Sequence, residues 1–136
     1  MALAFGFTYC PRICPVTLAH LSRAWEQRGP AASDAQVVFV TVDPERDTPE
    51  RMHEFLSFFN PAFIGATGTA RQLEAVNRDF GVTARRAFST DKKLGYEVHH
   101  SSFVYLIDRE GRLRLLMPFG KTTDDLVHDI KLLLNE

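Results

Sequence analysis

Two kinds of hydrophobic pattern follow one another along this chain. Short, nearly continuous apolar runs at residues 2–7, 36–42 and 102–107 are typical of buried strands, and the β-branched run at 36–42 suits a parallel sheet. Between these runs, apolar residues recur every three or four positions, which indicates amphipathic helices. The predicted order is therefore strand, helix, strand, helix, helix, two-stranded hairpin and helix.

Four helices are predicted from their apolar stripes. The first covers residues 15–27, because Leu18, Leu21 and Trp25 recur at helical spacing. Proline is tolerated at the first helical position, which Pro15 would occupy. Trp25 is then expected in the core. The stripes of the other three helices fall within residues 52–59, 73–80 and 126–133.

Capping residues mark the helix ends. Thr69 and Gln72 fit a capping box at the start of the third helix, and Gly81 fits its end. Either Thr122 or Thr123 is expected to cap the last helix, where the acidic residues that follow suit the positive N-terminal end.

The strand at residues 102–107 is expected to form a hairpin with residues 112–117, through a turn in which Gly111 can take a positive φ. Residues 82–98 show the least regular pattern, and we expect a solvated loop there. The alternative is a docking patch for an acidic partner. The basic residues of this stretch are Arg85, Arg86, Lys92 and Lys93.

Length and charge exclude several classes of protein. The 136 residues suit one domain spanning 1–136, and 45% hydrophobic residues exclude a disordered or fibrous chain. A net charge of −1 gives no field that would attract nucleic acid or an anionic membrane surface. No signal peptide or membrane-spanning run is visible. The apolar start at residue 2 suggests a chain cut from a longer protein, so localisation evidence could be lost with the missing part.

The segment Cys10-Pro11-Arg12-Ile13-Cys14 carries the most obvious chemistry. Cys14 lies at or near the start of the first helix, where unsatisfied N–H groups favour a thiolate, and Arg12 adds a cation. Three outcomes fit two such thiols: a structural disulfide, a redox pair, or a site for a soft metal such as copper or zinc.

The order of elements predicts an α/β, thioredoxin-like fold with a central mixed sheet flanked by helices. In that arrangement the strand at 102–107 runs antiparallel beside the strand at 2–7. Its beginning then lies next to the end of the first strand. We therefore expect His99 and His100 to meet Cys10 and Cys14 at one edge of the sheet.

The cysteine spacing differs from that of redox enzymes with this fold. Thioredoxin-like motifs have two residues between the cysteines, whereas three separate Cys10 from Cys14. The proline that such enzymes carry before the adjacent strand is absent from residues 99–102. Peroxiredoxins place a threonine three residues before the reactive cysteine, but Phe7 stands there.

Three segments together resemble the Sco/SenC family of copper chaperones. They are Phe5-Gly6-Phe7-Thr8-Tyr9-Cys10-Pro11-Arg12-Ile13-Cys14-Pro15, Thr41-Val42-Asp43-Pro44-Glu45-Arg46-Asp47-Thr48-Pro49 and His100-Ser101-Ser102-Phe103-Val104-Tyr105-Leu106-Ile107-Asp108. They occur in the family's order and span nearly the whole chain.

The resemblance implies a metallochaperone rather than an enzyme. It implies one copper ion, Cu(I) or Cu(II), bound by Cys10, Cys14 and His100, with Asp43 near the site. It further implies assembly of the dinuclear copper centre of cytochrome c oxidase, with the copper-bearing subunit or another copper chaperone as partner. The expected place is the periplasmic side of a bacterial inner membrane or the mitochondrial intermembrane space, with an N-terminal anchor and a leading hairpin that this chain lacks.

Two positions depart from the family pattern. Arg12 and His99 stand where members usually carry acidic residues. Both changes remove negative charge beside the metal, which should weaken retention of Cu(II) more than Cu(I). His99 is also left as a competing ligand for the metal.

Other polar residues have simpler interpretations. Asp43, Glu45 and Asp47 could form acid–base pairs, but we expect them to cap the next helix and to pair with Arg46. Three histidines within helical patterns are expected at the surface or its boundary: His20, His53 and His128. Met117 is expected to be a strand residue and not part of a copper channel.

A second function stays open beside the metallochaperone. In it, Cys10 and Cys14 form the redox pair of a thiol–disulfide oxidoreductase that keeps copper-ligand cysteines of a partner reduced. Cys10 would attack and Cys14 would resolve the mixed disulfide. The two functions can coexist, because Cu(I) binding requires the dithiol form.

Overall fold

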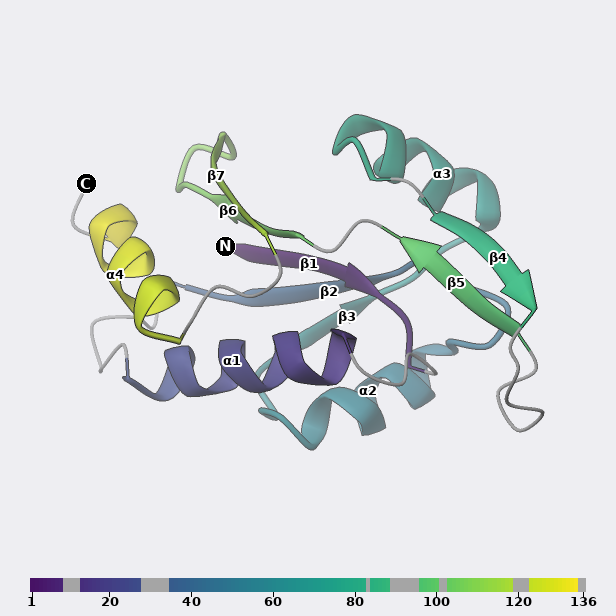
Figure 1. The fold of residues 1–136 in the computed structure, drawn as a ribbon, viewed down its shortest axis with the longest axis horizontal. Coiled ribbons are helices and arrows are strands. Elements are labelled where there is room, and N and C mark those ends of the chain that lie inside the picture. Colours follow the sequence, from purple (N-terminus) through teal and green to yellow (C-terminus); the bar gives the residue numbers. More distant parts are fainter. Residues whose placement is uncertain are drawn as a thin grey trace.

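The computed structural model describes residues 1–8, 13–27, 35–82, 84–88, 96–100, 103–118 and 123–134. Only the backbone is described at residues 13–14, 84–88, 96–100, 103, 123 and 134. The main sheet has five strands in the order β3-β2-β1-β6-β7, and β4 and β5 form a separate two-stranded sheet (Figure 1). The strands of the main sheet are β1 (Ala2–Gly6), β2 (Val37–Thr41), β3 (Ile64–Ala66), β6 (Phe103–Ile107) and β7 (Leu113–Pro118).

The central strand, β1, determines the topology around the cysteine segment. It pairs in parallel with β2, so that Gly6 lies opposite Thr41. It pairs antiparallel with β6, so that Ala4 lies opposite Val104. The sheet is therefore mixed, and the expected antiparallel placement of residues 102–107 beside the first strand is confirmed.

Helices cover both faces of this sheet (Figure 1). The helices are α1 (Ile13–Gln27), α2 (Pro49–Ser57), α3 (Ala70–Asp79) and α4 (Thr123–Leu134). One core cluster joins α1, α2 and α4 to one face, and it includes Leu18, Leu21, Trp25, Met52 and Ile130. A second cluster lies on the α3 side, where Phe5, Tyr105 and Phe80 stack edge to face or tilted. Trp25 is buried, as expected from its place in the helical stripe.

Local signals mark the element ends correctly. Thr69 and Gln72 form the complete capping box, and Gly81 follows with a φ of 67°. Gly111 has a φ of 80° in the turn between β6 and β7. The last helix begins at Thr123, while Thr122 lies outside the described residues.

The expectation of a loop over residues 82–98 is wrong for residues 84–88 and 96–98, while residues 83 and 89–95, with Lys92 and Lys93, lie outside the described residues. The strands β4 (Ala84–Phe88) and β5 (Tyr96–His100) pair antiparallel, with Phe88 opposite Tyr96. Their sequences contain charged residues and little β-branched character, so the pattern gave no strand signal; pairing between the two strands stabilises them instead. The short strand β3 was also missed, because three residues are too few for a periodic pattern.

Candidate metal centre

The first candidate ligands lie just beyond the end of β1. Sheet pairing of β1 ends at Gly6, the described chain continues to Thr8, and Cys10 lies outside the described residues. Cys14 is the second residue of α1, which starts two residues earlier than predicted. The backbone N–H groups of a first helical turn have no partners within the helix, so this position favours a thiolate.

The third candidate ligand, His100, is the last residue of β5 and not part of a loop before β6. Phe103 is three positions further along the chain, so the two residues lie at most roughly 10 Å apart. The register of β1 with β6 puts the beginning of β6 beside the end of β1. In the view of Figure 1, the end of β5 lies above the end of β1 and the start of α1 lies below it. The pairing of β1 with β6 agrees with the topology from which the meeting of Cys14 and His100 was predicted, and the ligand set itself stays a prediction.

The two neighbouring histidines occupy different places in the β4–β5 ribbon. His99 lies opposite Arg85, and His100 lies opposite Ala84. Successive residues of a strand belong to opposite faces of a sheet. In a regular strand, therefore, His99 and His100 belong to opposite faces, and only one of them is on the face where a given metal site lies.

A buried polar cluster lies where β1 leaves the sheet, and sequence analysis did not find it. Asp47 is 1% exposed and accepts three hydrogen bonds. Its Oδ1 accepts from the Thr8 hydroxyl at 2.6 Å, and its Oδ2 accepts from the Thr8 backbone N–H at 3.0 Å and from the Thr41 hydroxyl at 2.7 Å. Arg51 Nε donates to the Thr8 hydroxyl oxygen at 2.7 Å. The cluster connects the end of β1 to the end of β2 and to α2.

A second ion pair lies next to this cluster. Arg46 Nε is 2.6 Å from Oδ2 of the buried Asp43, and the Arg46 guanidinium carbon lies 5.8 Å from the centre of the Phe7 ring. The expected pairing of Arg46 with this acidic segment is confirmed. Such a cation over an aromatic face stabilises the packing of Phe7, which precedes Thr8.

The expectation that Asp47 caps the next helix is wrong. The cap of α2 is Thr48, whose hydroxyl accepts from the Arg51 backbone N–H at 3.2 Å. Asp47 is directed to Thr8 and Thr41 instead, and Glu45 is exposed. Carboxylates held in this way by buried donors form structural links rather than an acid–base pair.

The remaining candidates are not brought to this edge. His53 and His128 are exposed and His20 is half-buried, as expected for surface or boundary positions, and Met117 is a buried strand residue. Among the side chains that the structure describes, no three His, Cys, Asp or Glu residues gather as metal ligands. The three proposed ligands lie outside that set, because Cys10 is not described and Cys14 and His100 are described by their backbone alone.

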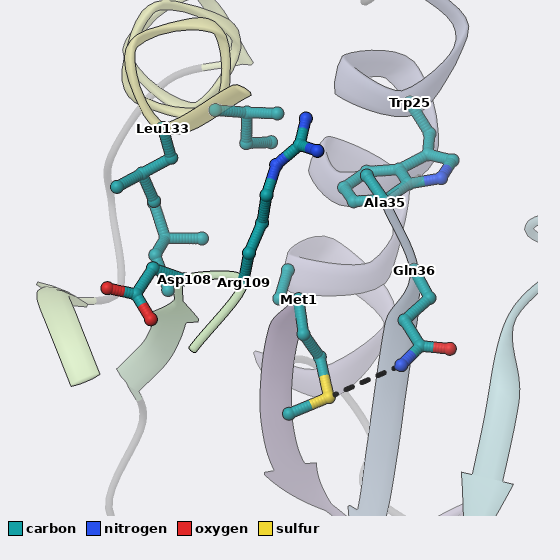
Figure 2. A pocket seen from close by; sticks show the side chains of 10 residues that line it. Met1, Trp25, Ala35, Gln36, Asp108, Arg109 and Leu133 are labelled. Carbon is teal, nitrogen blue, oxygen red and sulfur yellow. Dashed lines mark hydrogen bonds between the residues drawn. The ribbon is translucent and has the colours of Figure 1, made fainter. Parts of the chain in front are cut away.

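A cavity of about 300 Å³ lies at the other end of the sheet. It is lined by Met1, at the start of β1, by Asp108, just after β6, and by Trp25 and Leu133 from two helices (Figure 2). The cysteine segment follows the opposite end of β1. This cavity is therefore separate from the candidate metal centre.

Comparison with known proteins agrees with this geometry. Residues 1–135 match the SCO1/SenC family, and the chain belongs to that family. An SCO2-like protein of Rickettsia conorii is 43% identical over 108 residues, which cover 79% of this chain and 53% of the relative. Protein sco1 of Schizosaccharomyces pombe is 38% identical over 128 residues, 93% of this chain and 49% of the relative. The chain thus spans about half the length of these relatives.

Solved structures show the same fold. The copper-bound ScoI of Arabidopsis thaliana superimposes with a TM-score of 0.90 at 32% identity, covering 98% of this chain and 83% of that one. The copper-bound ScoI of Bradyrhizobium japonicum gives a TM-score of 0.87 at 32% identity, covering 97% and 83%. The predicted thioredoxin-like fold is confirmed. Within the described part of the chain, no helix is both long and apolar enough to cross a membrane.

Proposed function

We propose that this chain binds one copper ion through Cys10, Cys14 and His100 and passes it to another protein. Two thiolates and one imidazole form a soft donor set that suits copper. The observation that carries the proposal is topological: β6, which begins three positions after His100, pairs antiparallel with β1, the strand that leads to Cys10 and Cys14. Two family members of the same fold were solved with copper bound.

Copper is the cargo in this proposal, so the site must release it as well as hold it. Three protein ligands leave a position at which an acceptor's ligand can enter, and exchange then proceeds one ligand at a time. Arg12 and His99 place no negative charge beside the ion, which favours Cu(I) over Cu(II) retention.

The acceptor that we propose is the dinuclear copper centre of cytochrome c oxidase, with the copper-bearing subunit or another copper chaperone as the partner. Family membership supports this assignment. We place the protein at the periplasmic side of a bacterial inner membrane or in the mitochondrial intermembrane space, and relatives include a mitochondrial SCO1 homolog of Arabidopsis thaliana. Residues 1–136 are proposed to act as one thioredoxin-like domain.

Paired histidine variants test the ligand set. His100→Ala is expected to weaken Cu(I) binding sharply, by about tenfold or more, while dithiol oxidation and reduction continue. His99→Ala is the matched control, because it removes the same side chain from the adjacent position on the opposite face of the ribbon. Affinity is measured by competition with a chelator of known Cu(I) affinity. Wild-type affinity in His100→Ala would show that the ligand assignment is wrong.

A second function, thiol–disulfide exchange, is favoured by the place of Cys14 in the first turn of α1. That position stabilises the thiolate that exchange requires. The oxidoreductase would reduce a disulfide between the copper-ligand cysteines of a partner, and Cys10 and Cys14 would themselves become a disulfide in that step. A thiol reductant such as glutathione would then restore the dithiol, which is the form that binds Cu(I).

A further inference from the structure

We propose that Asp47 is a positioning residue for the cysteine segment: its carboxylate fixes Thr8, the residue from which the chain leads to Cys10. The inference rests on the proposed function, because it concerns the same two thiols. Thr8 lies two residues before Cys10, and it is the last described residue of the chain before that segment.

The position of the cluster supports this role. Backbone pairing of β1 with β2 ends at Gly6, whose carbonyl still accepts from the Val42 N–H at 2.8 Å. At Phe7 and Thr8, contacts with side chains take the place of sheet pairing. Phe7 packs under Arg46, and Thr8 is held by Asp47. Hydrogen bonds to the cluster therefore hold the chain at Thr8, two residues beyond the last β1 residue that pairs with β2.

The hydrogen bonds also show what the carboxylate holds. Two of its three donors are the backbone N–H and the hydroxyl of Thr8, so the main chain and the side chain of that residue are both fixed. The third donor is the Thr41 hydroxyl at the end of β2, which fixes Asp47 to the sheet. A buried carboxylate needs such partners, and their directions leave Thr8 little freedom.

Arg51 completes the arrangement from α2. Its Nε donates to the Thr8 hydroxyl oxygen while that hydroxyl donates to Asp47, so the hydroxyl acts as donor and acceptor at once. The cation compensates the buried charge of the carboxylate through this bridge. Both roles of the hydroxyl fix the rotamer of Thr8.

This anchoring matters because two thiols must reach one ion. The backbone at Cys14 belongs to α1, and Cys10 follows Thr8 by two positions in the sequence. Releasing Thr8 widens the range of separations between the two sulfurs, and fewer of those separations suit a metal or a disulfide. Loss of partners that orient metal ligands typically weakens metal binding by about 10–100-fold.

The test compares Asp47→Asn with Asp108→Asn. Asp108 is a control, because its carboxylate also accepts hydrogen bonds from the backbone, in its case from the N–H groups of Glu110 and Arg112, and it lies at the opposite end of β1. We expect Asp47→Asn to weaken Cu(I) binding by roughly 10–100-fold in competition with a chelator. Asp108→Asn should stay within twofold of wild type. Equal affinities in both variants and wild type would overturn the inference, as would an equal loss in both variants.

A readout without metal separates this inference from the proposed function. The equilibrium between the Cys10–Cys14 dithiol and its disulfide is measured against glutathione, and Asp47→Asn should shift the equilibrium constant by about tenfold while Asp108→Asn does not. If wild type binds no copper, the proposed function fails, and this equilibrium decides the inference alone. An unchanged equilibrium would then overturn it.

Thr8 supplies a second pair of variants if Asp47→Asn does not fold. Thr8→Val keeps the shape and the backbone N–H but removes the hydroxyl that joins Asp47 and Arg51. Thr8→Ser keeps the hydroxyl. We expect Thr8→Val to lose copper affinity and Thr8→Ser to restore it; equal affinity of Val and Ser variants would overturn the inference.

Discussion

The hydroxyl of Thr8 donates to Asp47 Oδ1 at 2.6 Å, between residues 39 positions apart in the sequence. This bond links the exit of β1 to the loop that follows β2. It belongs to a buried cluster whose charges are balanced between carboxylates and arginines. The cysteine segment therefore begins from a fixed point of the scaffold rather than from a free strand end.

The thiol pair can be tested as a catalyst with metal removed. In the presence of a copper chelator, the wild-type protein is expected to turn over a disulfide substrate with glutathione as reductant, because Cys14 lies in the first turn of α1. Cys10→Ser should abolish turnover, since it removes the attacking thiol. A wild-type rate equal to that of Cys10→Ser would exclude the oxidoreductase function and leave the metallochaperone function untouched.

The core packing between α1 and the sheet should dominate stability. Leu21 is 0% exposed, so Leu21→Ala leaves a cavity and should lower the free energy of unfolding by about 2–5 kcal/mol. Leu132→Ala is the control, because Leu132 is 55% exposed on α4 and its truncation should change stability by less than about 0.5 kcal/mol. Urea denaturation of both variants measures the difference. Similar losses of unfolding free energy in the two variants would contradict the assignment of Leu21 to the core.

Acid should weaken the hairpin of β6 and β7 through Asp108. The backbone N–H of Arg112 is the main reason that the pKa of Asp108 is lowered from 3.8 to about 2, and the Glu110 N–H and the Arg112 side chain add to the effect. A lowered pKa in the folded state stabilises the fold above pH 3.8, and this contribution is lost as the pH falls toward 2.

Asp108→Asn isolates this contribution. The difference in free energy of unfolding between wild type and the variant should be constant above about pH 5 and should shrink as the pH falls from 3.8 toward 2. Denaturation at a series of pH values measures this difference. Parallel curves for the two proteins across that range would contradict the assigned cause.

Gly111 should be replaceable only at a backbone cost. Its φ is 80°, and a Cβ built there meets no atom within 4 Å, so strain and not crowding decides the effect. Gly111→Ala should lower the free energy of unfolding by about 1–2 kcal/mol, and Gly111→Asn by less, because asparagine tolerates this conformation better. Thermal unfolding of the two variants tests the order. A more stable alanine variant would contradict it.

Much of the fold could be predicted because its signals are local. The capping box at Thr69 and the positive φ of Gly111 depend on residues only a few positions apart. The helical stripe that buries Trp25 is equally local. Pairing of β6 with β1 was predicted from the order of elements, since few topologies accommodate that order.

The errors arose where long-range contacts decide the structure. Residues 84–88 and 96–100 form strands because they pair with each other, although neither has a typical strand pattern. Asp47 was expected, with Asp43 and Glu45, to cap the next helix, but the cap is Thr48. Its actual partner, Thr8, could not be recognised from local sequence, because a hydrogen bond across 39 residues leaves no spacing to detect.

By itself, the sequence identified the two cysteines and the histidines as candidate ligands. It also indicated that a helix starts at or near Cys14, where free N–H groups favour a thiolate. It further determined the order of elements, from which we predict that these residues meet at one edge of the sheet. The tertiary structure decided that His99 and His100 fall on opposite faces of a paired strand, and that Asp47 holds the chain just before Cys10. The physical reason is that strand pairing and buried hydrogen bonds depend on partners distant in sequence, which only the folded chain brings together.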